Sequence, residues 1–252
     1  GVVGAQGADE SRAMYRSLLG GGDPAPPGTV VLVGGGPGDP GLITVRGLDA
    51  IRAADVVVHD RLAPTAVLAY ARPDALVLDV GKAPTRHRTS QDDINALLVE
   101  HARAGRRVVR LKGGDNFVFG RGGEEWQACA EAGVPVIVVP GVSSAIAVPG
   151  VVGIPLTHRF VVQGFTVVSG HLAPDDPGST LDWGALARAG TTLVVLMGVS
   201  HLARISARLI AEGMPAYTPS AVIANGFAPD QVVVRASLAE IAAAAAAAGV
   251  GP

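Results

Sequence analysis

Apolar positions along the chain fall into two patterns. Short runs rich in β-branched residues alternate with longer segments in which apolar residues recur every three or four positions. From Thr29 onward this alternation is typical of strands and amphipathic helices layered around a mostly parallel sheet. We expect strands over residues 29–33, 56–59, 76–79, 107–111 and 136–139. The pattern therefore predicts an α/β fold.

Helices are predicted between these strands. Segments 42–54 and 91–104 each carry their apolar residues on one helical face. After Gly141 a second round predicts strands near 165–169, 192–197 and 221–223, with helices near 200–212 and 237–248. The last of these helices would begin at a capping box, Ser237-x-x-Glu240.

Glycine and proline are dense between Pro140 and Pro155, which favours a domain hinge in that region. The charge-free stretch 134–157 is long enough to span a membrane, but its prolines and glycines would break a helix, and we interpret it as buried strand and loop. We expect a flexible tail over 1–28, without a signal peptide. An N-terminal α/β domain over 29–141 and a C-terminal α/β domain over 142–252, lacking its last strand, would follow.

The composition narrows the class of function. Twenty basic and 22 acidic side chains give a net charge of -2, so the basic surface typical of nucleic-acid-binding proteins is not expected. Cys129 is the only cysteine, and the six histidines show no paired ligand spacing. Neither a disulfide nor a metal site is therefore predicted. These features favour a cytoplasmic protein with no nucleic-acid partner and no membrane attachment.

A glycine-rich loop follows the first predicted strand. Gly36-x-Gly38-x-x-Gly41 satisfies the dinucleotide-binding pattern, and Asp60 follows the second strand, where a ribose-binding acid is sought. Pro37 and Pro40, however, remove two N–H donors that a pyrophosphate would need. Either the backbone of this loop lies close to a flat or uncharged part of a ligand, or the loop is only a structural turn. A dinucleotide-dependent oxidoreductase and a non-catalytic nucleotide-binding module remain alternatives.

A second glycine-rich loop, residues 112–125, follows another predicted strand. Two such loops at the carboxyl ends of strands predict a ligand site there. Asp115 either holds a ribose or amino group of that ligand or stabilises an Asx turn. Glu124 and Glu125 are interpreted as the acidic first turn of the next helix rather than as a catalytic pair.

Lysine is rare among the basic residues. Lys82 and Lys112 are the only two, and both lie beside predicted loops. A lysine can exchange a proton when burial shifts its pKa, whereas arginine stays charged. The retention of these two lysines therefore suggests a role in proton transfer. Near Lys82 and Asp60 lies a basic cluster that suits either a ligand with several carboxylates or a solvated loop. It comprises His59, Arg61, Arg86, His87 and Arg88.

Five motifs resemble those of the tetrapyrrole methylase family and are most similar to its uroporphyrinogen-III C-methyltransferases, within a resemblance that extends over about residues 29–249. They are Val33-Gly-Gly-Gly-Pro-Gly-Asp-Pro-Gly-Leu-Ile-Thr44, Ala54-Asp-Val-Val-Val-His-Asp-Arg-Leu62, Val109-Arg-Leu-Lys-Gly-Gly-Asp-Asn-Phe-Val-Phe-Gly-Arg-Gly-Gly-Glu-Glu125, Val139-Pro-Gly-Val-Ser-Ser144 and Gly153-Ile-Pro-Leu-Thr-His-Arg159. The chain departs from the family pattern at Asn116, where proline is usual, at Phe160, where aspartate is usual, and in its missing last apolar strand.

The resemblance implies two α/β domains with S-adenosylmethionine bound in the cleft between them, in a homodimer. Carried over by motif, the donor site would comprise Pro37, Gly113, Gly114, Asp115, Val118, Ser143, Ser144, Met197 and Gly226. Asp60 and Lys82 match positions assigned to proton transfer, and Arg61, Arg86, His87 and Arg88 would bind the carboxylates of the tetrapyrrole.

The implied reaction converts uroporphyrinogen III through precorrin-1 to precorrin-2, on the route to sirohaem and cobalamin, and releases S-adenosylhomocysteine. Because the same loops would bind the same donor, a methyltransferase acting later in corrin synthesis is an alternative.

Overall fold

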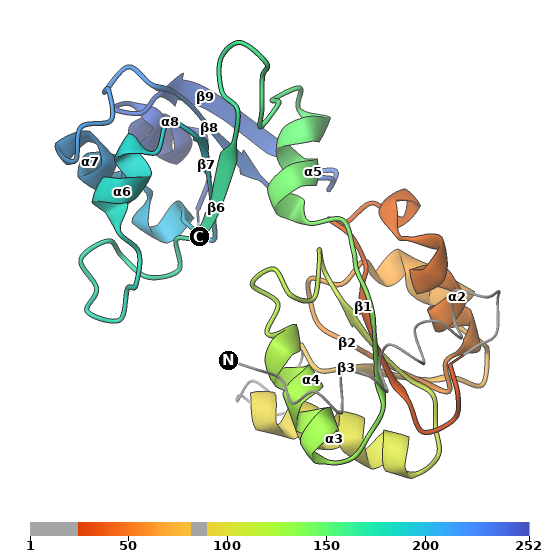
Figure 1. Ribbon diagram of the computed structural model, residues 1–252. Coiled ribbons are helices and arrows are strands. Elements are labelled where there is room, and N and C mark those ends of the chain that lie inside the picture. Colours follow the sequence, from red (N-terminus) through yellow and green to blue (C-terminus); the bar gives the residue numbers. More distant parts are fainter. Residues whose placement is uncertain (1–24, 82–89, 252) are drawn as a thin grey trace. The chain divides into compact units, whose positions relative to one another are not determined.

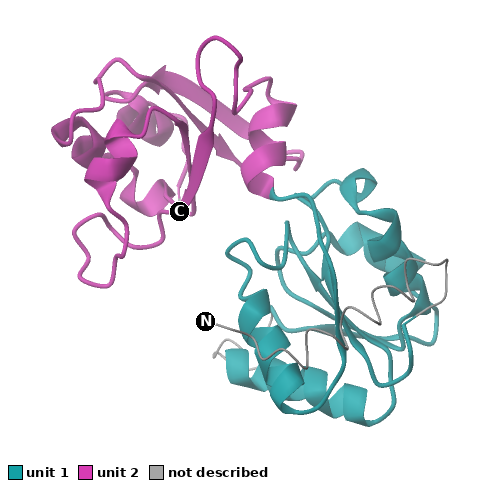
Figure 2. Cartoon of the chain, viewed as in Figure 1, with its two compact units in different colours: residues 1–143 teal, residues 144–252 magenta. Residues whose placement is uncertain are grey.

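The computed structural model describes residues 25–81 and 90–251. The chain divides into two compact units, 1–143 and 144–252 (Figure 2). The division falls two residues after Gly141, the end of the expected first domain.

The first unit is built on a five-stranded parallel sheet with the order β3-β2-β4-β1-β5 (Figure 1). Its strands are β1 (Val30–Gly34), β2 (Val56–His59), β3 (Leu76–Asp79), β4 (Val108–Lys112) and β5 (Val136–Val139). All five predicted strands are confirmed to within one residue at each end. The central strand β4 lies between β2 and β1 and pairs with both, and all of its residues are buried.

Helices cover both faces of this sheet. On one face, residues such as Val30, Leu32 and Val108 pack against α3 (Gln91–Arg103) and α4 (Gly122–Glu131). The alternate residues pack on the other face against α2 (Val45–Ala53) and the 3-10 helix η2 (Thr65–Tyr70). Figure 1 shows α3 and α4 on the opposite side of the sheet from α2. A strand that is buried on both faces reads as a continuous apolar run, as β1 and β2 do, whereas the edge strand β3 is mostly exposed.

Helix ends follow local capping chemistry. The helix predicted over 42–54 begins later, because the Thr44 hydroxyl accepts a hydrogen bond from the Gly47 N–H (3.1 Å) and sets the N-terminus of α2. The preceding residues form a separate 3-10 helix, η1 (Pro40–Leu42), capped by Asp39. α3 begins at a capping box between Ser90 and Asp93.

The interpretation of 134–157 as strand and loop was partly wrong. It contains β5, but it also contains the helix α5 (Ser144–Val151), which includes Pro149. This helix has no charged residue, so its sequence shows no polar face and no helical period. Over 25–81 and 90–251, no helix combines the length and apolar character required to cross a membrane.

The second unit contains two small sheets. β6 (Phe165–Ser169) pairs in parallel with β7 (Thr192–Leu196), whereas β8 (Pro219–Ala224) pairs antiparallel with β9 (Val232–Ser237). Besides α5, its helices are α6 (Trp183–Arg188), the 3-10 helix η3 (Val199–His201), α7 (Leu202–Ala211) and α8 (Ile241–Ala247). Trp183, Ile205, Leu209 and Leu238 form a buried core cluster of this unit.

The predicted start of the last helix was also wrong. Ser237 ends β9, a strand that the sequence interpretation missed, and α8 begins only at Ile241. The Ser237 hydroxyl does donate to the Glu240 carboxylate (2.7 Å), but this bond spans the turn between strand and helix. The three valines that open β9 were the available signal.

Candidate functional site

The carboxyl ends of the five parallel strands meet at one edge of the first unit. Glycine-rich segments lie at this edge: Gly34 to Gly36 at the end of β1 and directly after it, Gly113 and Gly114 after β4, and Gly141 after β5. Asp60 directly follows β2 at the same edge. Open α/β sheets bind their ligands at this edge.

The glycine loops pack against one another through their backbones. Gly36 and Gly114 exchange two hydrogen bonds, with N–O distances of 3.2 and 2.6 Å. A Cβ on Gly34 would lie 2.5 Å from the Gly141 nitrogen, and one on Gly113 would collide with the carbonyl of Leu62. The absence of side chains therefore has a structural reason here, since it lets three loops meet at one point.

Asp115 holds two of these loops together. Its Oδ1 accepts a hydrogen bond from the Phe117 N–H (2.8 Å), which is the Asx turn weighed from the sequence. Its Oδ2 accepts from the Gly141 N–H (3.0 Å). Each carboxylate oxygen can accept a further hydrogen bond, so the half-buried side chain retains capacity toward a ligand.

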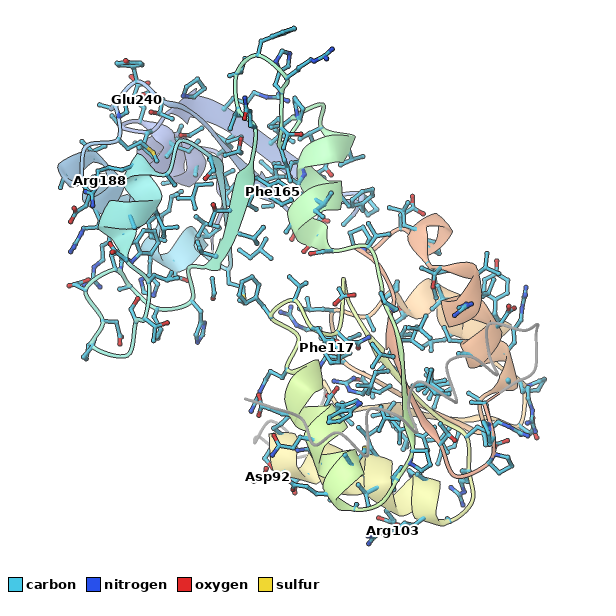
Figure 3. The ribbon with its side chains drawn as sticks, viewed as in Figure 1. Asp92, Arg103, Phe117, Phe165, Arg188 and Glu240 are labelled. Atoms are coloured by element: carbon cyan, nitrogen blue, oxygen red, sulfur yellow. The ribbon has the colours of Figure 1, made fainter. Side chains whose placement is uncertain are left out.

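The loop between β4 and α4 exposes apolar side chains beside this edge. Phe117, labelled in Figure 3, is 55% exposed and Phe119 is 46% exposed. Phe119 and Arg121 also have left-handed backbones, with φ of 55° and 56°. Left-handed backbone is costly for bulky residues and clusters in ligand-binding loops.

Four charged side chains form a network under the same edge, which we call the buried charge network: Asp60, Arg110, Lys112 and Glu125. Arg110 Nε lies 2.9 Å from Glu125 Oε1, and Arg110 Nη2 lies 3.0 Å from Asp60 Oδ2. Lys112 Nζ lies 3.1 Å from the same Glu125 oxygen. Burial lowers the pKa of the Lys112 ammonium, and the neighbouring Arg110 charge lowers it further.

Sequence reasoning missed the role of Glu125. It does lie in the first turn of α4, as expected, but it is completely buried, whereas its neighbour Glu124 pairs with Arg121 at the surface. The available signal was in β4, where Arg110 and Lys112 occupy alternate positions of an otherwise apolar strand. Alternate residues point to one face, so that face required a buried counter-charge.

The other residues expected to bind the donor are distributed over both units. Pro37 is half-buried after β1, Val118 is exposed beside Phe117, and Ser143 ends the first unit. In the second unit lie Ser144, at the start of α5, Met197, after β7 with a φ of 59°, and Gly226, after β8. Arg61 is exposed next to Asp60. Lys82, Arg86, His87 and Arg88 lie outside the described residues.

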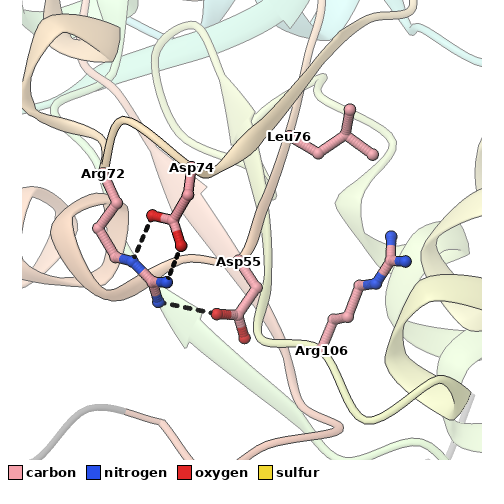
Figure 4. Close-up of a pocket in the computed structure, with 5 residues that line it drawn as sticks. All are labelled: Asp55, Arg72, Asp74, Leu76 and Arg106. Carbon is pink, nitrogen blue, oxygen red and sulfur yellow. Dashed lines mark hydrogen bonds and ion pairs between the residues drawn. The ribbon is translucent and has the colours of Figure 1, made fainter.

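A cavity of about 380 Å³ lies at the opposite edge of the sheet (Figure 4). It is lined by Asp55, Arg72, Asp74, Leu76 and Arg106. Arg72 is already paired with both aspartates. None of the residues predicted to bind a ligand lines this cavity.

The chain is similar in sequence to a family of known proteins. A sequence profile described as Tetrapyrrole (Corrin/Porphyrin) Methylases matches residues 29–242. The chain is 50% identical over 214 residues to siroheme synthase 1 of Klebsiella pneumoniae, a match that covers 85% of this chain and 45% of that protein. Siroheme synthase 1 of Serratia proteamaculans is 47% identical over 242 residues, or 95% of this chain and 50% of that protein. The chain thus spans about half the length of these relatives.

Solved structures show the same fold. Uroporphyrin-III C-methyltransferase from Thermus thermophilus, complexed with S-adenosylhomocysteine, superposes with a TM-score of 0.72 at 42% identity, covering 89% of this chain and 87% of that one. A cobalt precorrin-4 methyltransferase superposes with a TM-score of 0.79 at 25% identity, covering 88% and 91%.

Proposed function

This chain belongs to the tetrapyrrole (corrin/porphyrin) methylase family, and from that premise we propose that it methylates carbon atoms of uroporphyrinogen III with S-adenosylmethionine as the donor. Two successive transfers would convert uroporphyrinogen III through precorrin-1 to precorrin-2. The 42% identity to a uroporphyrin-III C-methyltransferase over 89% of this chain is the observation that carries the proposal.

The carboxyl edge of the first unit fits part of such a donor. S-adenosylmethionine would supply an electrophilic methyl group on a sulfonium. Asp115 is a half-buried carboxylate with free acceptor capacity, suited to hydroxyl or ammonium groups. Gly113 and Gly114 would present backbone without side chains, and Val118 would offer apolar contact. Pro37, Ser143, Ser144, Met197 and Gly226 would complete the donor contacts.

Asp60 and Lys82 would manage protons at the reacting edge of the macrocycle. When a macrocycle carbon takes the methyl group, the positive charge of the sulfonium passes to the macrocycle, which must then lose a proton to become neutral, so a nearby base is required. The Asp60 side chain is 28% exposed, and it is held by the Leu62 N–H at Oδ1 (3.1 Å) and by Arg110 at Oδ2. It is therefore both accessible and oriented. Lys82 would act as its acid partner.

The substrate carries eight carboxylates, which call for cations at the rim of the site. Arg61 is exposed and adjacent to Asp60. We assign it, with Arg86, His87 and Arg88, to carboxylate binding.

We also propose a cytoplasmic location and a homodimer. The single cysteine of the chain, which is buried, supports the location. The family resemblance supports the homodimer.

Mass spectrometry of the tetrapyrrole tests the activity. After incubation with uroporphyrinogen III and S-adenosylmethionine, we expect a product that carries two additional methyl groups, each gained with the loss of one proton, together with S-adenosylhomocysteine. Calorimetric titration should show binding of S-adenosylhomocysteine and none of NAD or NADP. If uroporphyrinogen III stays unmethylated, the proposal that it is the substrate is wrong. Methylation of a later corrin intermediate instead would favour the alternative that the precorrin-4 methyltransferase fold similarity supports.

A further inference from the structure

The buried charge network connects Asp60 to the interior of the first unit. Asp60 is its only member with appreciable exposure, since the side chains of Arg110, Lys112 and Glu125 are 2%, 8% and 0% exposed. Two cations face two anions, so the network is neutral as a whole. Neutrality makes the burial of these charges tolerable, but removing one member leaves an uncompensated charge inside the protein.

Arg110 has little freedom to move. Nε donates to Glu125 Oε1, Nη2 donates to Asp60 Oδ2, and Nη1 donates to the backbone carbonyls of Val58 (3.4 Å) and Leu111 (3.2 Å). A guanidinium is planar, so contacts on three of its nitrogens fix both its position and its plane. The guanidinium that donates to Asp60 is therefore held in one orientation.

Glu125 provides the inner anchor of this arrangement. Its Oε1 accepts from Arg110, from Lys112 and, at 3.4 Å, from Gln91 at the first position of α3. Oε2 has no hydrogen-bond partner among the described residues. Three donors thus bind the same oxygen of this buried carboxylate. Its orientation is fixed, because rotating the carboxylate would break all three hydrogen bonds.

We propose that Arg110 is a positioning residue for Asp60 and that Glu125 holds Arg110 in the position this requires. The inference rests on the proposed role of Asp60 in proton transfer. Arg110 would fix the direction of the Asp60 carboxylate at the carboxyl edge and keep its charge in place while the substrate binds. The network would thus act on turnover through Asp60 alone and would leave donor binding unchanged.

A double-mutant cycle separates this role from a purely structural one. Arg110→Met combined with Glu125→Gln removes one cation and one anion, so the remaining pair of Asp60 and Lys112 stays neutral. Because a misdirected catalytic group can lower turnover by about 10²-fold, we expect this paired variant to lower kcat by about 10–100-fold. KM for uroporphyrinogen III and Kd for S-adenosylhomocysteine should stay within about threefold of wild type.

The decisive measurement repeats the paired change in an Asp60→Asn background. If Arg110 acts through Asp60, the paired change should lower kcat there by less than about twofold. A matched control likewise removes one cation and one anion, at the opposite edge, with Arg72→Met and Asp74→Asn, which also ends the contact of Arg72 with Asp55. This control should leave kcat unchanged in both backgrounds.

Two results would overturn the inference. One is an equal loss of kcat in both backgrounds, which indicates a structural role, and the other is an unchanged kcat in the paired variant. If circular dichroism shows that the paired variant does not fold, Arg110→Lys takes its place in the cycle, because it keeps the charge but cannot bridge both carboxylates. A wild-type protein that forms no methylated product would overturn the proposed function, and this inference with it.

Discussion

The carboxylate of Asp115 accepts a hydrogen bond from the backbone N–H of Gly141, 26 residues further along the chain, at an Oδ2–N distance of 3.0 Å. One side chain therefore joins the loop that follows β4 to the end of β5. Both loops belong to the edge that we propose for the donor, so a donor contact at Asp115 would couple ligand binding to the stability of this edge.

Asp115→Ala should reveal both roles. Loss of the two backbone contacts should lower the free energy of unfolding by about 1–3 kcal/mol, and donor binding should weaken by about tenfold or more. Urea denaturation and titration with S-adenosylhomocysteine measure the two effects separately. If stability falls while the dissociation constant stays the same, Asp115 only shapes its loop.

Asn116→Pro should stabilise the protein. The Asn116 side chain is completely buried, and within the described part of the chain neither of its polar atoms has a hydrogen-bond partner. Proline removes this unpaired amide and also restricts the unfolded chain, so we expect a gain of about 1–3 kcal/mol in the free energy of unfolding. The bond from the Gly122 N–H to the carbonyl of residue 116 (3.0 Å) is retained.

Asn116→Ala is the matched control, because it removes the amide without stiffening the loop. It should give part of the gain measured in thermal denaturation. A melting temperature below wild type in the proline variant would show that the loop needs a backbone angle that proline cannot adopt.

Two neighbouring glycines at the start of α4 should respond in opposite ways to alanine. A Cβ on Gly122 would lie 2.6 Å from the carbonyl oxygen of Asn116, so Gly122→Ala should destabilise the fold. A Cβ on Gly123 meets nothing within 4 Å, and Gly123→Ala should stabilise the helix by about 0.5–1 kcal/mol. Denaturant unfolding of both variants tests this, and equal effects would contradict it.

Cys129 should be unreactive in the folded protein. Burial, with the nearby Glu125 charge, raises the pKa of its thiol to about 11, so at pH 7 only about one molecule in 10⁴ carries the thiolate. Labelling by a thiol reagent should be slow until denaturant is added. Since the unfolded thiol ionises first, the contribution of Cys129 to stability should be lost as the pH rises from about 9 to about 11. Rapid labelling without denaturant would show that the first unit opens locally.

Asp60 and Arg61 should separate chemistry from substrate binding. Asp60→Asn cannot accept a proton as a carboxylate, so turnover should fall by about 10²–10⁴-fold if proton transfer limits the rate. Lys82→Arg keeps the charge but replaces an ammonium, which can release a proton, with a guanidinium, which stays charged, and it should also lower turnover. Arg61→Gln should chiefly raise KM for the tetrapyrrole. Wild-type turnover in both Asp60→Asn and Lys82→Arg would leave these two residues only structural roles.

Local patterns were sufficient wherever each residue's role depends on its immediate neighbours. The strands of the first unit are short runs of mostly apolar residues, largely buried except in the edge strand β3, and α3 carries its cap and its apolar face in its own sequence. The family could likewise be recognised from motifs, because glycine-rich loops require defined residues at defined spacings. Where a segment lacked contrast between polar and apolar positions, as in α5, the pattern could not predict a helix.

Only the tertiary structure determined how the charges pair. The alternation of Arg110 and Lys112 in β4 shows that two cations share one face of the sheet. It does not show which acid meets them, because that depends on how α4 packs against the sheet and on which of its two glutamates faces inward. Glu124 and Glu125 are adjacent in sequence and identical in chemistry, yet one is at the surface and the other is fully buried. A helix turns by about 100° per residue, so neighbouring residues point in different directions, and only packing decides which of them enters the core.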